Sequence, residues 1–457
     1  MDPALLRRTT ELAVEYLASL ADRPVRADAS LGELRAAFGV PLDDAPRPPL
    51  EVIEDLAAAA DRGLVASQGP RYFGFVIGGG LDAAIAADWL TTVWDQNGGG
   101  FPVGPAAAVA EEVACGWLLD LLGLPADAGV GLTTGCQMAH FTCLAAARHR
   151  VLAEAGWDVE ADGLFGAPPI RVLVGAKAHT TVFAALRMLG LGSRRVEVVA
   201  ADDQGRMRAS ELARMLPAGR GPAIVIAQVG EVNTGAIDAM PEIMRLAREH
   251  GAWCHVDGAF GLWAAASPAL RALVEGVAGA DSWATDAHKW LNVPYDCGVA
   301  IVRDRAAHAA AMNSFAGAEY IPQPQHDERY QAEWVPEFSR RARGFAVYAA
   351  LRELGRRGVA ELVERCCGCA RLMASELGRD PRVDVLNDVV LNQVLVRFSH
   401  DGANVTDQVI DAVQLEGTCW MSGTEWDGEP AMRISVCNWR TTEDDIRRSA
   451  RAILTAA

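Results

Sequence analysis

The sequence predicts an α/β protein that is built on a mostly parallel sheet and followed by a smaller α+β region. Between about residues 72 and 305, short apolar runs alternate with segments of helical periodicity. The runs are rich in valine and isoleucine and lack polar alternation, which is typical of strands buried on both faces of a parallel sheet. They stand at 172–175, 196–200, 223–230, 253–257 and 298–302. Helical patterns such as residues 240–250 separate them, so we expect helices on both faces of the sheet.

The segments before and after this region show other patterns. Residues 1 to about 65 predict helices joined by a proline-rich connector at 41–49, because proline cannot continue a helix. After residue 340, the pattern predicts a long helix at 341–377, strands near 389–398 and 431–436, and a closing helix from Glu443. We therefore expect an N-terminal helical arm (1–65), a large domain (66–340) and a small α+β domain (341–457).

The composition excludes several classes of partner. Of 457 residues, 51% are hydrophobic and 22% are charged, as in globular proteins with a substantial core. The net charge of −17, from 42 basic and 59 acidic residues, repels nucleic-acid phosphates and anionic lipids. Residues 1–20 lack the unbroken apolar core of a signal peptide, and no charge-free stretch reaches membrane-spanning length. We expect a cytoplasmic protein that binds neither nucleic acid nor membranes.

The ten cysteines do not form the framework of a small disulfide-rich protein, because the chain is far too long for one. Their use fits a reducing compartment. Cys366, Cys367 and Cys369 cluster on the predicted long helix, but no second Cys/His pair at zinc-binding spacing accompanies them. We therefore interpret them as buried thiols and assign no metal.

Lysine is almost absent, because nearly all basic residues are arginine and only Lys177 and Lys289 remain. Arginine cannot form an imine, since its guanidinium stays protonated, so the two lysines are candidates for covalent chemistry. Lys289 lies between His288 and Trp290. Apolar neighbours should remove water from its ammonium and lower its pKa toward the range in which the free amine attacks a carbonyl. For Lys177, a functional role and an accident of composition are equally open.

A glycine-containing turn precedes one of the predicted helices. TTGCQMAH, at 133–140, leads into an apolar helix at 141–150. A helix N-terminus offers free backbone N–H groups and a positive dipole end to a phosphate. A plain helix-capping turn is the alternative.

A carboxylate stands at the end of a predicted buried strand. In HVDGAFG, at 255–261, Asp257 occupies the carboxyl end of the strand, where ligands of open α/β sheets gather. There it can pair with a pyridinium nitrogen and keep the ring an electron sink, although a helix-capping aspartate is the alternative. Phosphate turn, strand-end aspartate and apolar lysine, in this order, together indicate an enzyme that uses pyridoxal 5'-phosphate (PLP).

At these motifs, the sequence resembles the PLP-dependent group II amino-acid decarboxylases, relatives of the aromatic-amino-acid, histidine and glutamate decarboxylases. The resemblance runs from about Tyr72 to Arg343 and continues more weakly toward the C-terminus. HVDGAFG and ADSWATDAHKW are similar to the family's HVDAA and ADS…NPHKW. The resemblance implies the PLP-dependent transferase fold type I, with a seven-stranded, mostly parallel sheet and a smaller C-terminal domain.

The same resemblance implies the cofactor residues. Lys289 would bind PLP as a Schiff base, and Asp257 would pair with the pyridinium nitrogen. His179, in AKAHTTV, would stack on the cofactor ring; otherwise it is an ordinary polar loop residue. The remaining implied residues are Ala259 against the ring, Cys136 and Gln137 in the phosphate turn, and His288.

The resemblance also implies a substrate pocket. RYFGFV (71–76) and GGFPVGPAAAVAEEV (99–113) are similar to stretches that shape the family's pocket and dimer interface. They place Tyr72, Phe73 and Phe101 near the site, with plain core aromatics as the alternative. Glu231, in GEVNTG, and Tyr320 complete the expected pocket. We expect a homodimer with active sites at the subunit interface.

Three residues depart from the family pattern. Asp286 stands where the family usually has asparagine, and its carboxylate beside a phosphate would be repelled. We therefore expect its side chain to turn away or to be hydrogen-bonded elsewhere. Gln137 replaces a small hydroxyl residue, and Glu231 replaces a threonine. The departures indicate a divergent, bacterial-type subgroup outside the well-known aromatic decarboxylases.

The implied reaction is decarboxylation of an L-amino acid to the amine and carbon dioxide, through the Lys289 Schiff base and a quinonoid intermediate. The expected proton donor is Tyr330, in the polar loop 323–336, with Tyr320 as second choice and a loop tyrosine without a role as the alternative.

Other reactions remain open because the same fold hosts them. An aminotransferase, an aldolase or lyase, and a decarboxylating enzyme that forms an aldehyde are the alternatives. An aminotransferase usually clamps the substrate carboxylate with arginine, and Arg433 is the candidate, although we interpret it as part of a structural ion pair. A non-catalytic partner subunit is disfavoured, because Lys289, Asp257 and His179 occur together.

Overall fold

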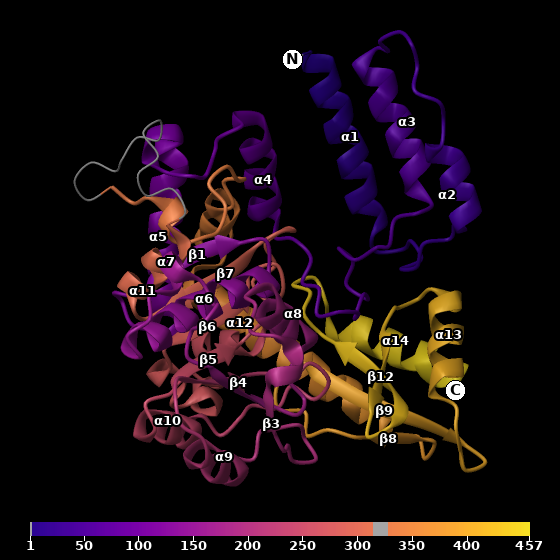
Figure 1. Ribbon diagram of the computed structural model, residues 1–457. Helices are drawn as coiled ribbons and strands as arrows, with labels where there is room; N and C mark the ends of the chain where they lie inside the picture. Colours follow the sequence, from indigo (N-terminus) through magenta and orange to yellow (C-terminus); the bar gives the residue numbers. More distant parts are fainter. Residues whose placement is uncertain (1, 314–327) are drawn as a thin grey trace.

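The computed structural model describes residues 2–313 and 328–457. Its centre is a seven-stranded sheet with the strand order β1-β7-β6-β5-β4-β2-β3 (Figure 1). β7 is antiparallel to both of its neighbours, and the other pairs are parallel. The strands are β1 (Gly129–Thr133), β2 (Arg171–Gly175), β3 (Glu197–Val199), β4 (Ala223–Gln228), β5 (Trp253–Asp257), β6 (Ser282–Asp286) and β7 (Gly298–Val302). The mostly parallel sheet expected from the sequence is confirmed.

Two of the seven strands were not predicted. β1 (GVGLT) is short and contains two glycines, and β6 (SWATD) carries serine, threonine and aspartate. All residues of both strands are nevertheless buried. Polar strand residues can be buried where hydrogen bonds satisfy them, so a search for apolar runs passes over such strands.

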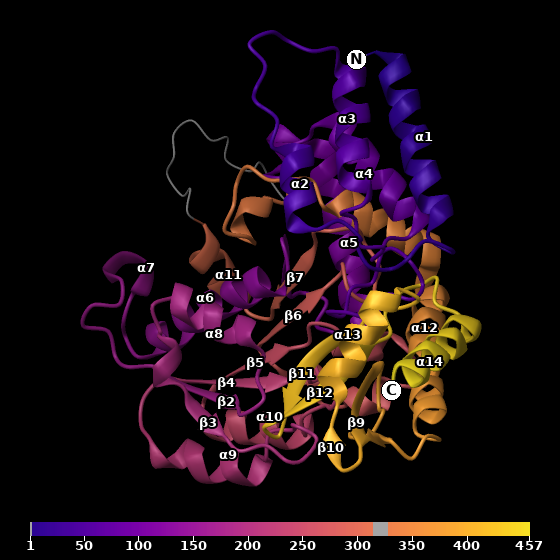
Figure 2. The ribbon, with the colours of Figure 1, turned by 90° about the vertical axis from the view of Figure 1, so that its right-hand side faces the viewer.

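Alternating strand residues divide the interior into two hydrophobic layers, one on each face of the sheet. On β2, for example, Val172 and Val174 pack in one layer, whereas Leu173 packs in the other. Helices α6 (Cys136–Glu154), α8 (Thr180–Met188) and α11 (Arg305–Met312) cover the Val172 face. Helices α5 (Pro105–Leu122) and α10 (Met240–Glu249) cover the other (Figure 2). This period of two fits a strand buried on both faces.

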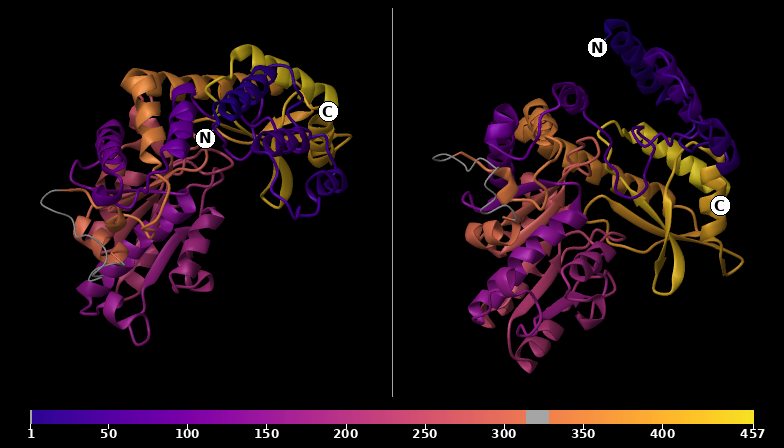
Figure 3. Two further views of the ribbon diagram at one scale, coloured as in Figure 1. Left: turned by 90° about the horizontal axis from the view of Figure 1, so that it is seen from above. Right: turned by 45° about the horizontal axis from the view of Figure 1, so that its top comes forward.

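The N-terminal helices project from the body of the protein (Figures 1 and 3). They are α1 (Pro3–Ser19), α2 (Leu31–Phe38) and α3 (Pro49–Asp61), and none of their residues is buried. A capping box between Ser30 and Glu33 begins α2. The base of the projection is anchored by Leu20 and Val25, which are buried, and the N–H of Val25 donates to Gly417 O over 2.8 Å.

The C-terminal region contains a second, antiparallel sheet with the order β10-β9-β12-β11, and β8 pairs with β9. Its strands are β8 (Val383–Val385), β9 (Gln393–His400), β10 (Ala403–Asn404), β11 (Ser422–Trp426) and β12 (Glu429–Ser435). Helices α12 (Gly344–Leu377), α13 (Thr406–Glu416) and α14 (Glu443–Ala456) accompany them. The long helix, the strands near 389–398 and 431–436, and the closing helix from Glu443 are therefore confirmed.

Helix α12 contacts both parts of the molecule. Its first turns pack on the helices of the large sheet, where the Phe345 ring lies 5.1 Å from the Trp94 ring. Its helical geometry is interrupted at Gly355, with φ 58°. Beyond it, Arg365 donates to Trp439 O over 2.7 Å. The domain boundaries at 65/66 and 340/341 remain our proposal, with the second at the start of this shared helix.

The remaining described helices connect these units. They are α4 (Asp82–Trp94), α7 (Val159–Asp162), α9 (Ala209–Met215) and the 3₁₀ helices η1 (Phe101–Val103), η2 (Ser193–Arg195), η3 (Leu216–Ala218), η4 (Gly261–Ala266), η5 (Arg271–Val274), η6 (Val277–Gly279) and η7 (Gln331–Glu333). All ten cysteines are free and buried. In the described ranges, no helix has the length and apolar character that crossing a bilayer requires.

Candidate active site

Residues from four distant segments meet at one edge of the large sheet. Asp257 is the last residue of β5 and Asp286 the last residue of β6, its parallel neighbour. Lys289 follows three residues later, while Cys136 begins α6 directly after β1. His179 is the N-cap of α8, which follows β2. The carboxyl ends of parallel strands share an edge, so the topology gathers these side chains where open α/β sheets bind ligands.

The Lys289 amine is paired with a carboxylate. Its Nζ lies 3.1 Å from Oδ2 of Asp286. Burial alone lowers the pKa of the amine, but the Asp286 carboxylate, helped by Cys136, outweighs burial, and the net shift is upward. The lowered pKa expected from the apolar neighbours is therefore wrong, because that reasoning counted the loss of water and not the partner three residues away.

Asp286 does not turn away from the site. Its Oδ2 binds Lys289, and its Oδ1 lies 3.5 Å from Nε2 of His288. That Oδ1 is buried and has no hydrogen-bond partner among the described residues. A Cβ atom at Gly135 would lie 3.7 Å from the same oxygen. One oxygen of the carboxylate is thus paired with Lys289, and the other faces the turn that contains Gly135.

Asp257 is held by donors on both of its oxygens. The Ala259 N–H donates to Oδ1 over 3.2 Å, and His140 Nε2 lies 3.5 Å from Oδ2. Burial alone would raise the pKa of the carboxyl group, but His140, with smaller contributions from His179 and Lys289, holds it far below its usual value. Asp257 is therefore an ionised carboxylate, as a partner of a protonated pyridine nitrogen must be.

His179 and His288 both have pKa values lowered by burial. His179 Nδ1 lies 2.8 Å from Oγ1 of Thr181, which orients the ring at the start of α8. His288 Nδ1 accepts a hydrogen bond from the Cys297 N–H over 3.1 Å, and the His288 ring stacks on Tyr295 with centroids 4.3 Å apart. Both rings are therefore mostly neutral and fixed in direction.

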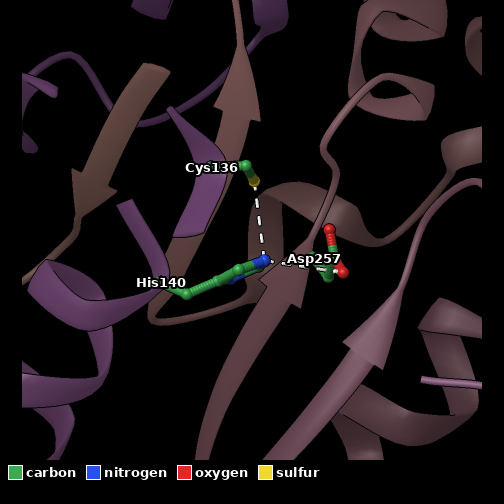
Figure 4. Close-up of side chains that lie close together, drawn as sticks. All are labelled: Cys136, His140 and Asp257. Carbon is green, nitrogen blue, oxygen red and sulfur yellow. Dashed lines mark hydrogen bonds and ion pairs between the residues drawn. The ribbon is translucent and has the colours of Figure 1, made fainter. Parts of the chain in front are cut away.

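Two histidines behind Asp257 were not among the predicted site residues. His140 Nδ1 lies 2.9 Å from Nε2 of His255, and both rings are fully buried. His140 Nε2 also lies 3.5 Å from Sγ of Cys136 (Figure 4). Both histidines stand inside motifs singled out from the sequence: His140 is four residues from Cys136 on one helix, and His255 is two residues from Asp257 on one strand. Those spacings place each pair on one side of its element and could have revealed them.

Cys136, His140 and Asp257 also meet the geometric requirements for sharing a metal ion, because their donor atoms all lie within 4.8 Å of one another. Burial raises the pKa of the Cys136 thiol well above its usual value, with further increases from Asp286 and Asp257. A metal ion bound there would have to displace the thiol proton, because cysteine ligates metals as a thiolate.

The predicted pocket aromatics occupy different places. Tyr72 stacks on Trp420 with centroids 5.1 Å apart, and burial together with nearby Tyr295 raises the pKa of Tyr72 to about 12. Through Tyr295 and His288, Tyr72 is thus connected to the Lys289 loop. Phe73 is part of the hydrophobic core, which was the alternative for this residue, and Phe101 is partly buried in η1.

Tyr295 is a further aromatic residue that sequence reasoning missed. Loss of water around the phenol raises its pKa to about 12, and its ring stacks on that of His288, the residue before Lys289. The sequence could have indicated Tyr295 through its position in NVPYDCG, which directly follows the lysine motif.

Glu231 and Arg433 make contacts other than those that the sequence predicted. The Glu231 carboxylate accepts hydrogen bonds from the N–H groups of Asn233 and Thr234, each over 2.7 Å, and so closes its own turn. Arg433 makes no ion pair with a described residue; Nη2 donates to Ser422 Oγ over 3.4 Å, and Nε is buried without a partner. Burial lowers the pKa of Arg433 against the effect of Glu231. The interpretation of Arg433 as part of a structural ion pair is wrong for the described chain.

None of the other predicted residues that the structure describes makes an ion pair or hydrogen bond with Lys289, and one predicted residue lies outside the described chain. Tyr330 is buried against Gly100 and Phe338, and its hydroxyl has no hydrogen-bond partner in the described chain. Tyr320 lies outside the described residues. Gln137 is exposed in the first turn of α6. Lys177 lies 4.2 Å above the Trp426 ring and 3.7 Å from Asp427, so the second lysine has surface partners of its own.

One polar residue ties the Lys289 loop to the C-terminal region. Asn292 is fully buried, and its Nδ2 donates to Cys437 O over 3.0 Å. Its Oδ1 accepts the Trp439 N–H over 2.9 Å. Asn292 adopts φ 55°, a left-handed conformation that asparagine tolerates better than most residues.

A buried amine, an ionised strand-end carboxylate and a glycine turn at one sheet edge define the class of PLP enzymes. The profile described as "Pyridoxal-dependent decarboxylase conserved domain" matches residues 32–399. The chain therefore belongs to the pyridoxal-dependent decarboxylase family, and its cofactor is pyridoxal 5'-phosphate.

Individual relatives catalyse different reactions. The chain is 30% identical to L-2,4-diaminobutyrate decarboxylase of Rhizobium meliloti (strain 1021), over 81% of this chain and 74% of that protein. It is 24% identical to aromatic-L-amino-acid decarboxylase of Bacillus atrophaeus, over 96% and 92%. It is also 23% identical to phenylacetaldehyde synthase of Arabidopsis thaliana, over 99% and 96%.

Solved structures confirm the fold. Oryza sativa TDC with PLP and tryptamine superposes with a TM-score of 0.90 at 22% identity, covering 100% of this chain and 99% of that chain. Mouse CSAD superposes with a TM-score of 0.89 at 20% identity, covering 99% and 98%.

The residues present fit the cofactor. Lys289 supplies the amine, and Asp257 is an ionised carboxylate without a lysine or arginine partner in the described chain. The turn before α6 contains Gly135, where a Cβ atom would come within 3.3 Å of the His288 ring, so the turn leaves room that a side chain would fill. The unpartnered Oδ1 of Asp286 is the feature least suited to a neighbouring phosphate.

Proposed function

We propose that this enzyme decarboxylates an L-amino acid to the corresponding amine and carbon dioxide, with Lys289 as the attachment point of the cofactor. The observation that carries the proposal is the shared sheet edge of the Lys289 amine and the ionised Asp257 carboxylate. Family membership supports decarboxylation, while the relatives' different substrates leave the amino acid to be identified by assay.

When bound, PLP supplies an electron sink for the bond that breaks at the substrate carbon. Asp257 would hold the proton on the ring nitrogen, because donors on both of its oxygens favour the charged carboxylate. The Lys289 ammonium must lose a proton before it can attack a carbonyl, and Asp286 Oδ2, at 3.1 Å, is the nearest carboxylate acceptor.

Arg433 would bind a carboxylate of the substrate. Its guanidinium makes no ion pair with the described residues, and it is close enough to His179 to lower the pKa of that ring. A buried cation without a partner is unfavourable, and a substrate carboxylate would relieve it. The same feature favours an aminotransferase as the second candidate function.

The proton that replaces carbon dioxide would come from Tyr330, with Tyr320 as the alternative donor. The Tyr330 hydroxyl has no hydrogen-bond partner in the described chain, so it is available as a donor. Its ring contacts Gly100, which adjoins Phe101, another proposed pocket residue.

We propose that the protein works as a homodimer with active sites at the subunit interface. Helix α4 exposes Trp89, Leu90, Val93 and Trp94, each at more than a third of its surface. The N-terminal helices expose further apolar side chains, including Leu50, Val52 and Leu56. Large exposed apolar patches mark interaction sites. Light scattering should therefore give twice the 48.7 kDa mass of one chain.

The function is tested by incubating the PLP-loaded enzyme with each of the twenty common amino acids. Carbon dioxide, amine, aldehyde and keto acid are measured for each, with the Lys289→Ala variant as the blank. We expect one amine and carbon dioxide in equal amounts. Aldehyde and ammonia in place of the amine would establish the aldehyde-forming alternative. Keto acid formed in step with an added aldehyde or keto-acid acceptor would establish the aminotransferase.

A further inference from the structure

Three hydrogen-bond contacts form a line behind Asp257, and a fourth, longer contact joins that line to the carboxylate. Trp253 Nε1 donates to Oγ of Ser282 over 2.9 Å, and that oxygen lies 2.9 Å from Nδ1 of His255. His255 Nε2 lies 2.9 Å from Nδ1 of His140, and His140 Nε2 lies 3.5 Å from Asp257 Oδ2. All five residues are buried. The line joins two strands and one helix to a single carboxylate oxygen.

The two ends of this line set the direction of its hydrogen bonds. The Trp253 indole can only donate, and the ionised Asp257 can only accept. With both imidazoles neutral and the Nε2–H of His140 placed between Asp257 Oδ2 and Cys136 Sγ, one arrangement satisfies every contact of this line. Ser282 donates to His255 Nδ1, His255 Nε2–H donates to His140 Nδ1, and His140 Nε2–H points at Asp257.

An additional proton on His140 does not change the last bond. His140 Nδ1–H would then donate to His255 Nε2, and His255 would turn its remaining N–H toward Ser282. Burial, with a further contribution from His140, lowers the pKa of His255 well below its usual value, so the extra proton does not reside on that ring. In both arrangements, a donor hydrogen of His140 faces Asp257.

We propose that His140 is a positioning residue that keeps Asp257 ionised and correctly oriented, and that His255 and Ser282 fix the tautomer of His140. The proposal rests on the proposed cofactor role of Asp257 but not on which product the enzyme forms. Without the His140 donor, the Ala259 N–H is the one hydrogen-bond donor to the Asp257 carboxylate among the described residues. A buried carboxylate that loses a donor binds a proton more readily, which would weaken its hold on the ring nitrogen.

The first test removes the donor. His140→Leu should lower the affinity for PLP and kcat by about 10- to 100-fold, as loss of an outer-shell partner does at metal sites, with KM changed by less than about twofold. His140→Gln, which keeps an amide donor, should recover part of the loss. His149→Leu is the matched control, because His149 is on the same helix and its ring faces Glu160 at 3.4 Å instead of the site.

The second test examines the line of contacts from Trp253 to Asp257 without measuring turnover. Nitrogen NMR of ¹⁵N-histidine-labelled apoenzyme should show His255 as a neutral ring, and Ser282→Ala should shift the tautomer balance of His255 and His140. Ser282→Ala keeps both histidines and provides this test even if His140→Leu does not fold. An unchanged spectrum in Ser282→Ala would refute the proposal that Ser282 and His255 fix the tautomer of His140.

Two other outcomes also overturn the proposal. His140→Leu could match His149→Leu in both PLP affinity and kcat, which would leave His140 without influence on Asp257. Alternatively, the purified enzyme could contain one zinc ion per chain that is lost in His140→Leu, which would make Cys136, His140 and Asp257 a metal site. If the enzyme forms keto acid but these tests give the expected results, the positioning role of His140 stands. Only the proposed decarboxylation would then be refuted.

Discussion

Asp257 and Asp286 occupy matching positions, because each ends a strand and the two strands are parallel neighbours. Their surroundings differ. Asp257 faces a backbone N–H and an imidazole that is itself supported by a second imidazole. Asp286 faces an ammonium and a histidine edge, and one of its oxygens has no hydrogen-bond partner in the described chain. The same residue type at the same sheet edge therefore serves two purposes.

The difference shows that neighbours decide what a strand-end carboxylate does. Environments that separate two titratable groups are a common way of assigning chemical roles within one site. Asp257 is anchored independently of Lys289, whereas Asp286 is anchored through it. Mutations at this edge should therefore affect the two carboxylates differently.

The largest effect is expected from removing Lys289, the ion-pair partner of Asp286. Lys289→Ala should lower activity by at least about a thousandfold and abolish the visible absorbance of the bound cofactor, because Lys177, the other lysine, is held by Trp426 and Asp427 instead of Asp286. Lys177→Ala is the control and should keep both. Peptide mapping after borohydride reduction identifies the modified lysine, and a label on Lys177 would refute the assignment.

The next largest effect should come from removing the negative charge of Asp257. Asp257→Asn keeps the shape but not the charge, so the cofactor should still bind while kcat falls by about 10²–10³-fold. Stopped-flow absorbance and steady-state kinetics separate cofactor binding from turnover. Near-normal turnover would remove Asp257 from the site and end the comparison.

Neither aspartate is our candidate for delivering the proton that replaces carbon dioxide; that role is proposed for Tyr330. Tyr330→Phe keeps the ring that packs on Phe338 and deletes the acid, so amine formation should fall by about a hundredfold. Oxygen-dependent aldehyde and ammonia should appear instead. Product analysis with and without dioxygen measures this change. Unchanged amine in Tyr330→Phe, together with loss in Tyr320→Phe, would transfer the role to Tyr320.

The smallest effect is expected at Asp286. The Lys289 pKa is raised by this carboxylate, so Asp286→Asn should lower it. Below that pKa, the fraction of free amine grows about tenfold for each unit that the pKa falls. Apoenzyme of the variant should therefore attach PLP faster at neutral pH, and its rate should level off at a lower pH. The rate of absorbance change on mixing, measured from pH 6 to 10, tests this. An unchanged pH profile would mean that Asp286 does not govern the amine.

Much of the large sheet and the central residues of the site could be predicted from sequence, since they depend on local patterns. Apolar runs indicated β2, β4 and β5, and the strand-end position of Asp257 followed from one of them. β1 and β6 were missed because their burial comes from neighbouring strands and not from an apolar run of their own. The same limit applies to domain boundaries, since α12 serves both sheets.

The parts of the site that were missed depend on contacts between distant segments. His140 and His255 are 115 residues apart in the chain and 2.9 Å apart in space, and no linear pattern encodes that pairing. The direction of the Lys289 pKa shift was wrong because burial and a charge partner act in opposite senses. For Arg433, the sequence showed a cation on a strand but not that none of the described carboxylates forms an ion pair with it.

The Asn292 crosslink has a mechanical consequence. A buried side-chain amide that bonds the Lys289 loop to both Cys437 and Trp439 loses several partners at once if the C-terminal segment detaches. We therefore expect the Lys289 loop and the segment that follows β12 to unfold together, and a fragment that ends before Cys437 to lose the native conformation of this loop. Local melting of the segment after β12 would thus reach the loop that carries Lys289 through the side-chain amide of Asn292.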